Sequence, residues 1–215
     1  MKRLKLKTNP YFGKLIVFEG MDGEGKTTMI SMTEQYMAAE QGREKVLTVK
    51  QPTDFSRKTK LFQKMMYCEE HLDIDYRAVQ LLTMSDRIQQ GVEVIEPALK
   101  EGKTVICDCY IYTSLANMLA RGYQKEKWFF DAAKYLLKPD LVFLAYVSPE
   151  LAIEQVDARP SECHRYFDKE LLYRVAGEFL RMAKREKFYV LDTEDEKFRL
   201  FSTIRSALGQ KGVSI

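Results

Sequence analysis

The most constraining feature of this chain is segment 20–27, which reads Gly-Met-Asp-Gly-Glu-Gly-Lys-Thr and completes the phosphate-binding pattern GxxxxGK[ST]. Segment 14–19 before it is apolar and suits a buried parallel strand, and segment 27–41 after it reads as a helix. The glycines let the backbone wrap an anion, while N–H groups at the helix N-terminus point toward phosphate. This strand–loop–helix order predicts a nucleoside triphosphate site, in which Lys26 adds a mobile charge and Thr27 offers a hydroxyl to Mg²⁺.

Composition limits the class of protein. A chain of 215 residues with 46% hydrophobic content can bury one sizeable core, so we expect one α/β domain over 1–215. The net charge of +3 is small, which does not favour a nucleic-acid partner. Segment 1–13 begins with several basic residues and reads as a solvated basic tail, too polar for a signal peptide. The longest apolar run, 141–147, is too short to span a membrane, so no membrane partner is expected.

The cysteines and histidines give no sign of a metal centre. Cys68, Cys107, Cys109 and Cys163 lack zinc-like spacing, and His71 and His164 are the only histidines. We therefore interpret the cysteines as reduced thiols of a cytoplasmic protein.

Strand-like and helix-like segments alternate along the rest of the chain. Further strands are expected at 45–50, 103–108, 140–147 and 188–192, and helices at 57–67, 76–100, 113–121, 128–137, 149–158, 167–185 and 197–208. Pro97 lies inside one of these helices and predicts a kink or an early end there. The alternation predicts the three-layer α/β fold of P-loop NTPases, with a five-stranded parallel sheet covered by helices on both faces.

Ligands of such sheets bind at the carboxyl ends of the strands. The expected strands end at the phosphate loop with Asp22, at Gln51, at Asp108 and at Asp192. A carboxylate directly after the strand next to the phosphate loop is where Mg²⁺ and phosphoryl chemistry require one, which favours Asp108. The alternative interpretation of Asp108 is the N-cap of the following helix.

At these positions the chain resembles the thymidylate kinases. Segment 18–28, with its aspartate inside the loop, is similar to the first motif of that family. Segments 51–53, 85–89, 108–116 and 159–168 resemble its later motifs in the same order, so that the resemblance extends from about residue 14 to 208. The chain is thus identified as a divergent member of the family, and the resemblance implies ATP as co-substrate and Mg²⁺ as cofactor.

The resemblance implies a set of site residues. The implied ATP-binding residues are Gly20, Met21, Asp22, Gly23, Glu24, Gly25, Lys26, Thr27 and Thr28. The implied acceptor-binding residues are Asp22, Gln51, Thr83, Arg87, Ser114 and Asn117. The implied catalytic residues are Lys26, Asp108, Arg159 and Arg165, and the implied metal ligands are Thr27 and Asp108.

The same resemblance implies roles for several of these side chains. Lys26 would neutralise the transferring phosphoryl group, Asp22 would bind the sugar hydroxyl of the acceptor, and Arg87 would grip the acceptor phosphate. Arg159 and Arg165 would close over the donor from a lid at about 157–168 and stabilise charge in the transition state. The alternative for the two lid arginines is a solvated basic loop.

Several positions depart from the pattern of the family. Cys109 stands where the family carries an arginine near the phosphates, with Arg121 or a lid arginine as possible replacements for that charge. Thr83 stands where an aromatic residue would stack on thymine. Asn117-Met118 and Gln51 also differ, and the acidic Glu24 cannot supply the arginine that some members carry in this loop. The donor half of the site is kept, while the half that recognises the base is altered.

The expected reaction is ATP- and Mg²⁺-dependent phosphorylation of a pyrimidine deoxynucleoside monophosphate, with dTMP giving dTDP. The alternatives are a kinase of the same fold for another nucleotide or a nucleoside, and a non-catalytic nucleotide-binding protein. The resemblance also implies a homodimer. Candidates for its interface, which could equally be ordinary core, are Leu81, Met84, Ile88, Met118 and Leu119.

Overall fold

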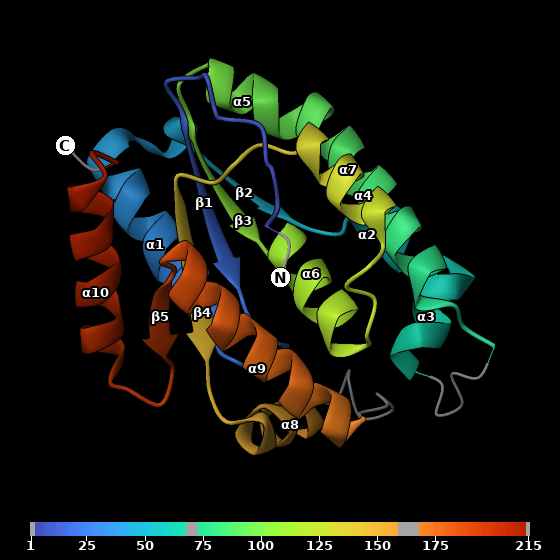
Figure 1. Ribbon diagram of the computed structural model, residues 1–215. Coiled ribbons are helices and arrows are strands. Elements are labelled where there is room, and N and C mark those ends of the chain that lie inside the picture. The colour runs from blue at the N-terminus through green and yellow to red at the C-terminus, as the bar shows by residue number, and fades with distance from the viewer. Residues whose placement is uncertain (1–2, 68–72, 159–167, 214–215) are drawn as a thin grey trace.

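The computed structural model describes residues 3–67, 73–158 and 168–213, and it is built around a parallel five-stranded sheet (Figure 1). The strand order is β2-β3-β1-β4-β5. The strands are β1 (Lys14–Glu19), β2 (Val46–Lys50), β3 (Thr104–Asp108), β4 (Leu141–Tyr146) and β5 (Tyr189–Asp192). The predicted fold class is therefore confirmed, and all five strands begin and end within one residue of the expected positions.

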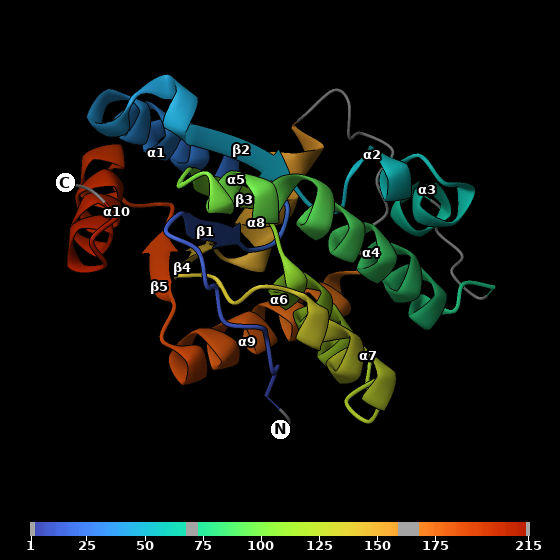
Figure 2. The ribbon, with the colours of Figure 1, turned by 90° about the horizontal axis from the view of Figure 1, so that it is seen from above.

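Helices cover both faces of the sheet (Figures 1 and 2). They are α1 (Lys26–Gln41), α2 (Asp54–Arg57), α3 (Lys60–Tyr67), α4 (Tyr76–Gln90), α5 (Glu96–Lys100), α6 (Ile111–Ala120), α7 (Lys127–Ala132), α8 (Pro149–Asp157), α9 (Lys169–Glu186) and α10 (Lys197–Gln210). Helices α1 and α10 pack on one face, while α4, α6, α7 and α9 belong to the core on the other. Among the described residues no helix is long and apolar enough to cross a bilayer.

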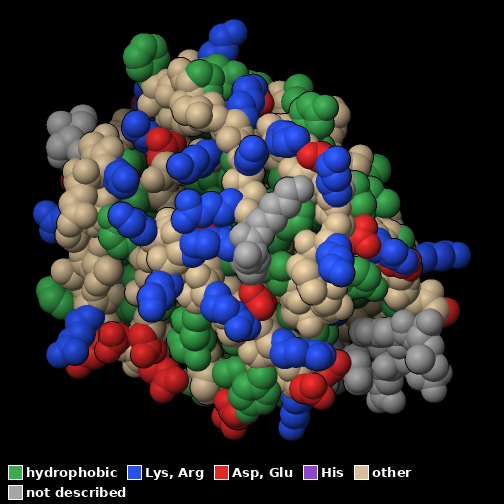
Figure 3. Space-filling view, viewed as in Figure 1, with side chains coloured by type: hydrophobic (Ala, Val, Ile, Leu, Met, Phe, Trp, Pro, Cys, Tyr) green, Lys and Arg blue, Asp and Glu red, His purple; other side chains and the backbone are tan. Residues whose placement is uncertain are grey.

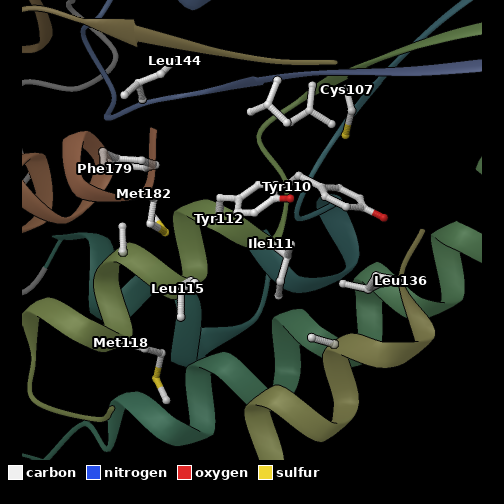
Figure 4. Packing of buried hydrophobic residues seen from close by; sticks show 14 of the residues in the cluster. Cys107, Tyr110, Ile111, Tyr112, Leu115, Met118, Leu136, Leu144, Phe179 and Met182 are labelled. Atoms are coloured by element: carbon white, nitrogen blue, oxygen red, sulfur yellow. The ribbon is translucent and has the colours of Figure 1, made fainter. Parts of the chain in front are cut away.

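The alternation of β1 explains the two cores. Leu15 and Val17 contribute to the core that α6 and α9 share, whereas Ile16 and Phe18 contribute to the core under α1 and α10. Figure 4 shows part of the first core, where side chains from the sheet meet those of α6 and α9; the labelled residues include Cys107, Leu115, Met118, Leu144, Phe179 and Met182. Because both faces of β1, β3 and β4 are covered, these central strands read as continuous apolar runs, whereas the edge strands β2 and β5 are partly exposed.

The long helix expected at 76–100 is irregular at the predicted place. It consists of α4, the π-helical turn Gly91–Ile95 and α5, with Pro97 in the first turn of α5. Proline lacks an N–H and its ring clashes with the carbonyl four residues earlier, so a widened turn before it relieves both problems. The helix expected at 57–67 is divided into α2 and α3, and the one expected at 128–137 ends as the 3₁₀ turn Ala133–Tyr135.

The N-terminal segment is not the solvated tail that its basic residues suggested. In the described part, Leu4 and Leu6 pack against the core, the Lys7 N–H donates to the Leu136 carbonyl (2.9 Å), and the Lys138 N–H donates to the Lys7 carbonyl (2.7 Å). The alternation of leucine with basic residues is a strand pattern, with the charges outward. Figure 3 shows Lys and Arg spread over this side of the molecule, with acidic groups among them.

Candidate active site

The phosphate loop connects β1 to α1 and depends on its glycines. Gly20, Gly23 and Gly25 have φ values of 136°, 91° and 72°, a region that side chains rarely adopt. A Cβ atom on Gly23 would lie 2.2 Å from the Ala152 carbonyl oxygen, so α8 packs directly on the loop. No side chain caps the N-terminus of α1, which leaves its N–H groups for an anion.

Lys26 is more enclosed than a flexible loop lysine. Its side chain is buried, and its Nζ donates to the carbonyl oxygens of Gly20 (3.0 Å) and Met21. Burial by itself would lower the pKa of this ammonium group, but the negative charge of nearby carboxylates such as Asp22 raises the pKa above its ordinary value. Lys26 is therefore charged at neutral pH and is held over the loop by the loop's own carbonyls.

Glu24 lies inside the loop rather than on its surface. Its side chain is 1% exposed, and its Oε2 accepts the Met21 N–H at 2.5 Å. Burial raises the pKa of this carboxyl to about 8, although Lys26 acts in the opposite direction. Glu24 thus adds little negative charge to the loop at neutral pH, and the loop has no arginine of the kind that some members of the family carry there.

Asp108 ends β3, the strand beside β1, and lies close to the phosphate loop. It pairs with Phe18 across the sheet, and its Oδ2 lies 3.8 Å from the Lys50 Nζ. The alternative role of Asp108 as a helix cap does not apply, because the N-cap residue of α6 is Tyr110 and makes no side-chain cap. The carboxylate of Asp108 and the exposed hydroxyl of Thr27 are hard oxygen ligands, the kind that Mg²⁺ takes beside phosphate oxygens.

Glu19 has a structural role that the sequence did not reveal. This fully buried carboxylate at the end of β1 accepts the N–H groups of Tyr112 and Thr113 (3.1 Å each) and the Thr113 hydroxyl. Burial raises its pKa to about 7, against the effect of these donors and of Arg87. Glu19 therefore fastens the N-terminus of α6 to the strand that carries the phosphate loop. An acidic residue at the end of an apolar strand was the available signal.

Next to the loop lies a cavity of about 200 Å³, walled by α3, α4, α6 and α9. All six side chains expected to bind the acceptor line this one cavity: Asp22, Gln51, Thr83, Arg87, Ser114 and Asn117. They come from segments up to 95 residues apart (22 to 117) and meet here because parallel strands release their loops at the same edge. The cavity also reaches Gly20 and Met21 of the phosphate loop, so donor and acceptor regions adjoin.

Arg87 is held differently from the expectation of an open fork. It is 2% exposed, and its two terminal nitrogens donate to the carbonyl oxygens of Thr83 and Tyr110 (3.3 Å each). Its Nε has no partner among the described residues. Burial lowers the pKa of the guanidinium, and Glu19 opposes this most strongly. Arg87 therefore keeps N–H donors for a ligand, although each of its terminal nitrogens is already engaged by one main-chain carbonyl.

Arg57 is a cation of this cavity that sequence reasoning missed. It lies at the end of α2, lines the cavity, and its Nε donates to the Pro52 carbonyl (2.8 Å). The strand-two segment is itself tied to α4, since Asp86 accepts the N–H and hydroxyl of Thr53 (2.7 and 2.6 Å). Arg121, proposed as a replacement for the charge missing at Cys109, also lines the cavity.

Cys109 adopts a backbone conformation that is unusual for its residue type. Its φ is 61°, and its N–H donates to the Phe18 carbonyl (2.9 Å), which holds it against the end of β1. Burial raises the pKa of its thiol to about 12, so the thiol is neutral. Strained backbone of this kind is concentrated at functional sites, which agrees with its position on the cavity wall.

The lid expected at about 157–168, with Arg159 and Arg165, falls largely outside the described residues. Asp168, at the end of this range, lines the cavity and caps α9 by accepting the Leu171 N–H (3.0 Å). Cys68, Cys163, His71 and His164 also lie outside the described residues, whereas Cys107 and Cys109 are free thiols.

A glycine loop at a helix N-terminus, a buried lysine, an adjacent carboxylate and a cavity beside the loop define a P-loop nucleotide-binding protein. The family model for thymidylate kinase matches residues 18–204 of the chain. A probable thymidylate kinase of Pyrococcus horikoshii is 36% identical over 177 residues, which cover 80% of this chain and 83% of that protein. The chain therefore belongs to the thymidylate kinase family.

More distant relatives agree over a greater length. The thymidylate kinase of Ligilactobacillus salivarius is 27% identical over 204 residues, or 91% of this chain and 97% of that protein. The crystal structure of thymidylate kinase from Ehrlichia chaffeensis superposes with a TM-score of 0.68 at 22% identity, covering 92% of this chain and 98% of that chain. This structural similarity shows that the two chains share a fold.

Proposed function

We propose that this chain is a nucleoside monophosphate kinase that transfers the terminal phosphoryl group of ATP to dTMP, giving ADP and dTDP. The observation that carries the proposal is the cavity beside the phosphate loop, which all six expected acceptor residues line. Membership of the thymidylate kinase family supports the same reaction.

In this reaction an oxygen of the acceptor phosphate attacks the γ-phosphorus, and the bond to the oxygen bridging the β- and γ-phosphates breaks. The N–H groups at the start of α1 and the Lys26 ammonium hold the donor phosphates and offset their charge. Thr27 and Asp108 would hold Mg²⁺, which would supply positive charge to offset that of the donor phosphates.

The acceptor phosphate needs cations of its own. We propose that Arg57 and Arg87 supply them, because both line the cavity and the Arg87 guanidinium keeps N–H donors beyond the two that main-chain carbonyls accept. Asp22 would bind the sugar hydroxyl of the acceptor, and Arg159 and Arg165 would act on the donor from the lid. Cys109 then requires no arginine, since the charge comes from α2 instead.

We also propose that the protein acts in the cytoplasm as a homodimer. Of the five candidate interface residues, Met84 and Met118 are buried in the core and are unsuitable. Leu81 of α4 is 55% exposed and Val92 of the π-helical turn is 61% exposed, so one side of the long helix presents apolar surface.

A coupled assay of ADP release with dTMP, dUMP, dCMP and thymidine tests the proposed function. We expect dTMP to be the preferred acceptor and the Lys26→Ala variant to lose about a hundredfold or more in turnover. The matched control is Lys45→Ala, which removes an exposed lysine after α1 and should leave turnover unchanged. Faster turnover with thymidine than with any monophosphate would favour a nucleoside kinase, and no turnover with any acceptor would favour a binding protein.

A further inference from the structure

Helix α4 holds the segment that follows β2 through two side chains to which the proposed function gives no role. The Asp86 carboxylate accepts both the N–H (2.7 Å) and the hydroxyl (2.6 Å) of Thr53. One helical turn further on, the Gln51 amide donates to the Gln90 Oε1 (2.9 Å), and the Gln90 Nε2 donates to the Lys50 carbonyl (3.2 Å). Asp86 and Thr53 do not themselves line the cavity, so any effect they have on a bound ligand passes through other residues.

Thr53 is the residue on which helix α2 starts. It is the N-cap of this helix of 4 residues, and its hydroxyl accepts the Phe55 N–H (3.1 Å) while donating to Asp86 (2.6 Å). A helix of one turn is not stable by itself, so its place depends on its cap and on the neighbouring α4 (Figures 1 and 2). Asp86 therefore fixes the cap of α2 from a different helix.

Arg57 is the last residue of α2 and is tied to the same turn. Its N–H donates to the Thr53 carbonyl (3.1 Å), its Nε donates to the Pro52 carbonyl (2.8 Å), and its guanidinium carbon lies 5.8 Å from the centre of the Phe62 ring. Two of these contacts are made with the turn that Asp86 secures. The position of the Arg57 guanidinium in the cavity wall consequently depends on Asp86.

The contacts of Asp86 and Arg57 meet in a single peptide group. The Thr53 N–H that Asp86 accepts and the Pro52 carbonyl to which Arg57 donates belong to one planar peptide bond. Asp86 is 4% exposed, and a buried carboxylate is costly unless its oxygens accept hydrogen bonds, as both do here. The peptide group is thus held between a carboxylate and a guanidinium.

Asp86 also precedes Arg87, the other cation assigned to the acceptor phosphate. We propose that Asp86 is a positioning residue, which holds Arg57 at the distance from Arg87 that a phosphate monoester needs. Helix α4 then carries one of the two cations directly and places the other through the Thr53 turn. Hydrogen bonds from arginine to phosphate are directional, so a displacement of about 1 Å weakens them. The inference rests on the proposed function and adds to it the residue that sets the two arginines relative to each other.

Asp86→Asn tests this role with two ligands that differ only in the phosphate. Asparagine keeps the size of the side chain but replaces one acceptor oxygen by an NH₂ group, so it cannot accept both Thr53 donors. The KM for dTMP should rise about tenfold while kcat stays within about threefold, because the acceptor phosphate is bound in both the ground state and the transition state. The inhibition constant of thymidine, which has no phosphate, should stay within about twofold of the wild-type value.

Removal of Arg57 should make Asp86 irrelevant to the acceptor. Arg57→Met by itself should raise the KM for dTMP at least as much as Asp86→Asn does. In the double variant, Asp86→Asn should then add less than about twofold, whereas independent effects would multiply. If Asp86 served only the overall stability of the fold, its effect would be the same in the Arg57→Met background.

Two substitutions at Thr53 repeat the test from the other side of the link. Thr53→Val removes the hydroxyl and should raise the KM for dTMP as Asp86→Asn does, whereas Thr53→Ser keeps both donors and should resemble wild type. Asp54→Asn is the matched control, because it changes an exposed carboxylate of α2 that pairs with Lys58 (2.7 Å), and it should leave the KM unchanged. Thermal melting identifies the folded variants, and the Thr53 pair decides the question if Asp86→Asn does not fold.

An unchanged KM in folded Asp86→Asn and Thr53→Val, an equal loss for thymidine and dTMP, or multiplied effects in the double variant would overturn the inference and leave the kinase assignment intact. Failure of the proposed function has a different signature, because the wild type would then phosphorylate no nucleoside monophosphate.

Discussion

The buried carboxyl of Glu24 should make this protein less stable as the pH rises, and Glu24→Gln should remove that dependence. The carboxyl is enclosed in the phosphate loop and its pKa is raised, chiefly by burial, from 4.5 to about 8. Glutamine keeps an acceptor for the Met21 N–H but carries no charge at any pH. The difference between wild type and variant therefore isolates the titration of this one group.

The sign and size of the effect follow from linkage. Below pH 4.5 the carboxyl is protonated in both the folded and unfolded chain, so folding pays no penalty for charge. Between pH 4.5 and 8 the unfolded chain releases the proton that the folded loop retains, and stability falls. At 1.36 kcal/mol per pH unit, the interval from 4.5 to about 8 corresponds to a loss of about 3 kcal/mol at pH 7 and about 5 kcal/mol above pH 8.

Urea denaturation without nucleotide at pH 5, 7 and 9 measures this loss. The free energy of unfolding of Glu24→Gln, relative to wild type, should rise steadily over this range. Glu40→Gln changes an exposed glutamate of α1 and should give a flat difference. Since ionised Glu24 also adds negative charge to the loop, the wild type should bind ATP more weakly above pH 8 than the variant does. A difference in unfolding free energy that does not change with pH would refute a buried, proton-retaining Glu24.

Three further predictions concern Cys109 and the dimer. Cys109→Gly should raise the free energy of unfolding by about 1 kcal/mol, because φ of 61° costs a side chain about that much, and unchanged or lower stability in urea would show that the thiol contacts matter more. Cys109→Arg should lower turnover with dTMP, since Arg57 and Arg121 already line the cavity, whereas faster turnover would identify a weakened enzyme. In sedimentation at micromolar concentration the wild type should have twice the chain mass. Leu81→Glu should give the monomer, because it places a charge on the exposed apolar face that also holds Val92. A wild-type monomer would rule the dimer out.

The strands and the phosphate loop could be predicted because their causes are local. The central strands β1, β3 and β4 are apolar runs buried on both faces, and the glycines of segment 20–25 adopt backbone angles that other residues avoid. The gathering of Asp22 and Gln51 in one cavity also followed, since parallel strands carry ligand sites at their carboxyl ends, whereas Arg87 and Asn117 lie on helices and were implied only by the resemblance to the family.

The burial of charge could not be predicted in the same way. Glu19 precedes the phosphate loop and Glu24 lies within it. The groups that enclose these two side chains come from α6 and the end of β4, far along the chain. The partners of Arg87 are main-chain carbonyls, and no side-chain pattern announces those. A motif therefore identifies which charged residues belong to the site, but it does not reveal which of their atoms are free to bind a substrate.

The N-terminal segment shows why composition misled where periodicity would have helped. Its basic residues suggested solvent, yet Leu4 and Leu6 alternate with them at the spacing of a strand. The backbone partner of that segment is the stretch 136–138, about 130 residues later, so nothing near it in sequence signals the pairing. Alternation of apolar and basic residues at a chain end is hard to interpret until the surface against which the segment packs is known, whereas charge can be counted directly from the sequence. When the two disagree, the apolar period is the better guide, because exposing two leucines costs more free energy than placing lysines on a surface strand.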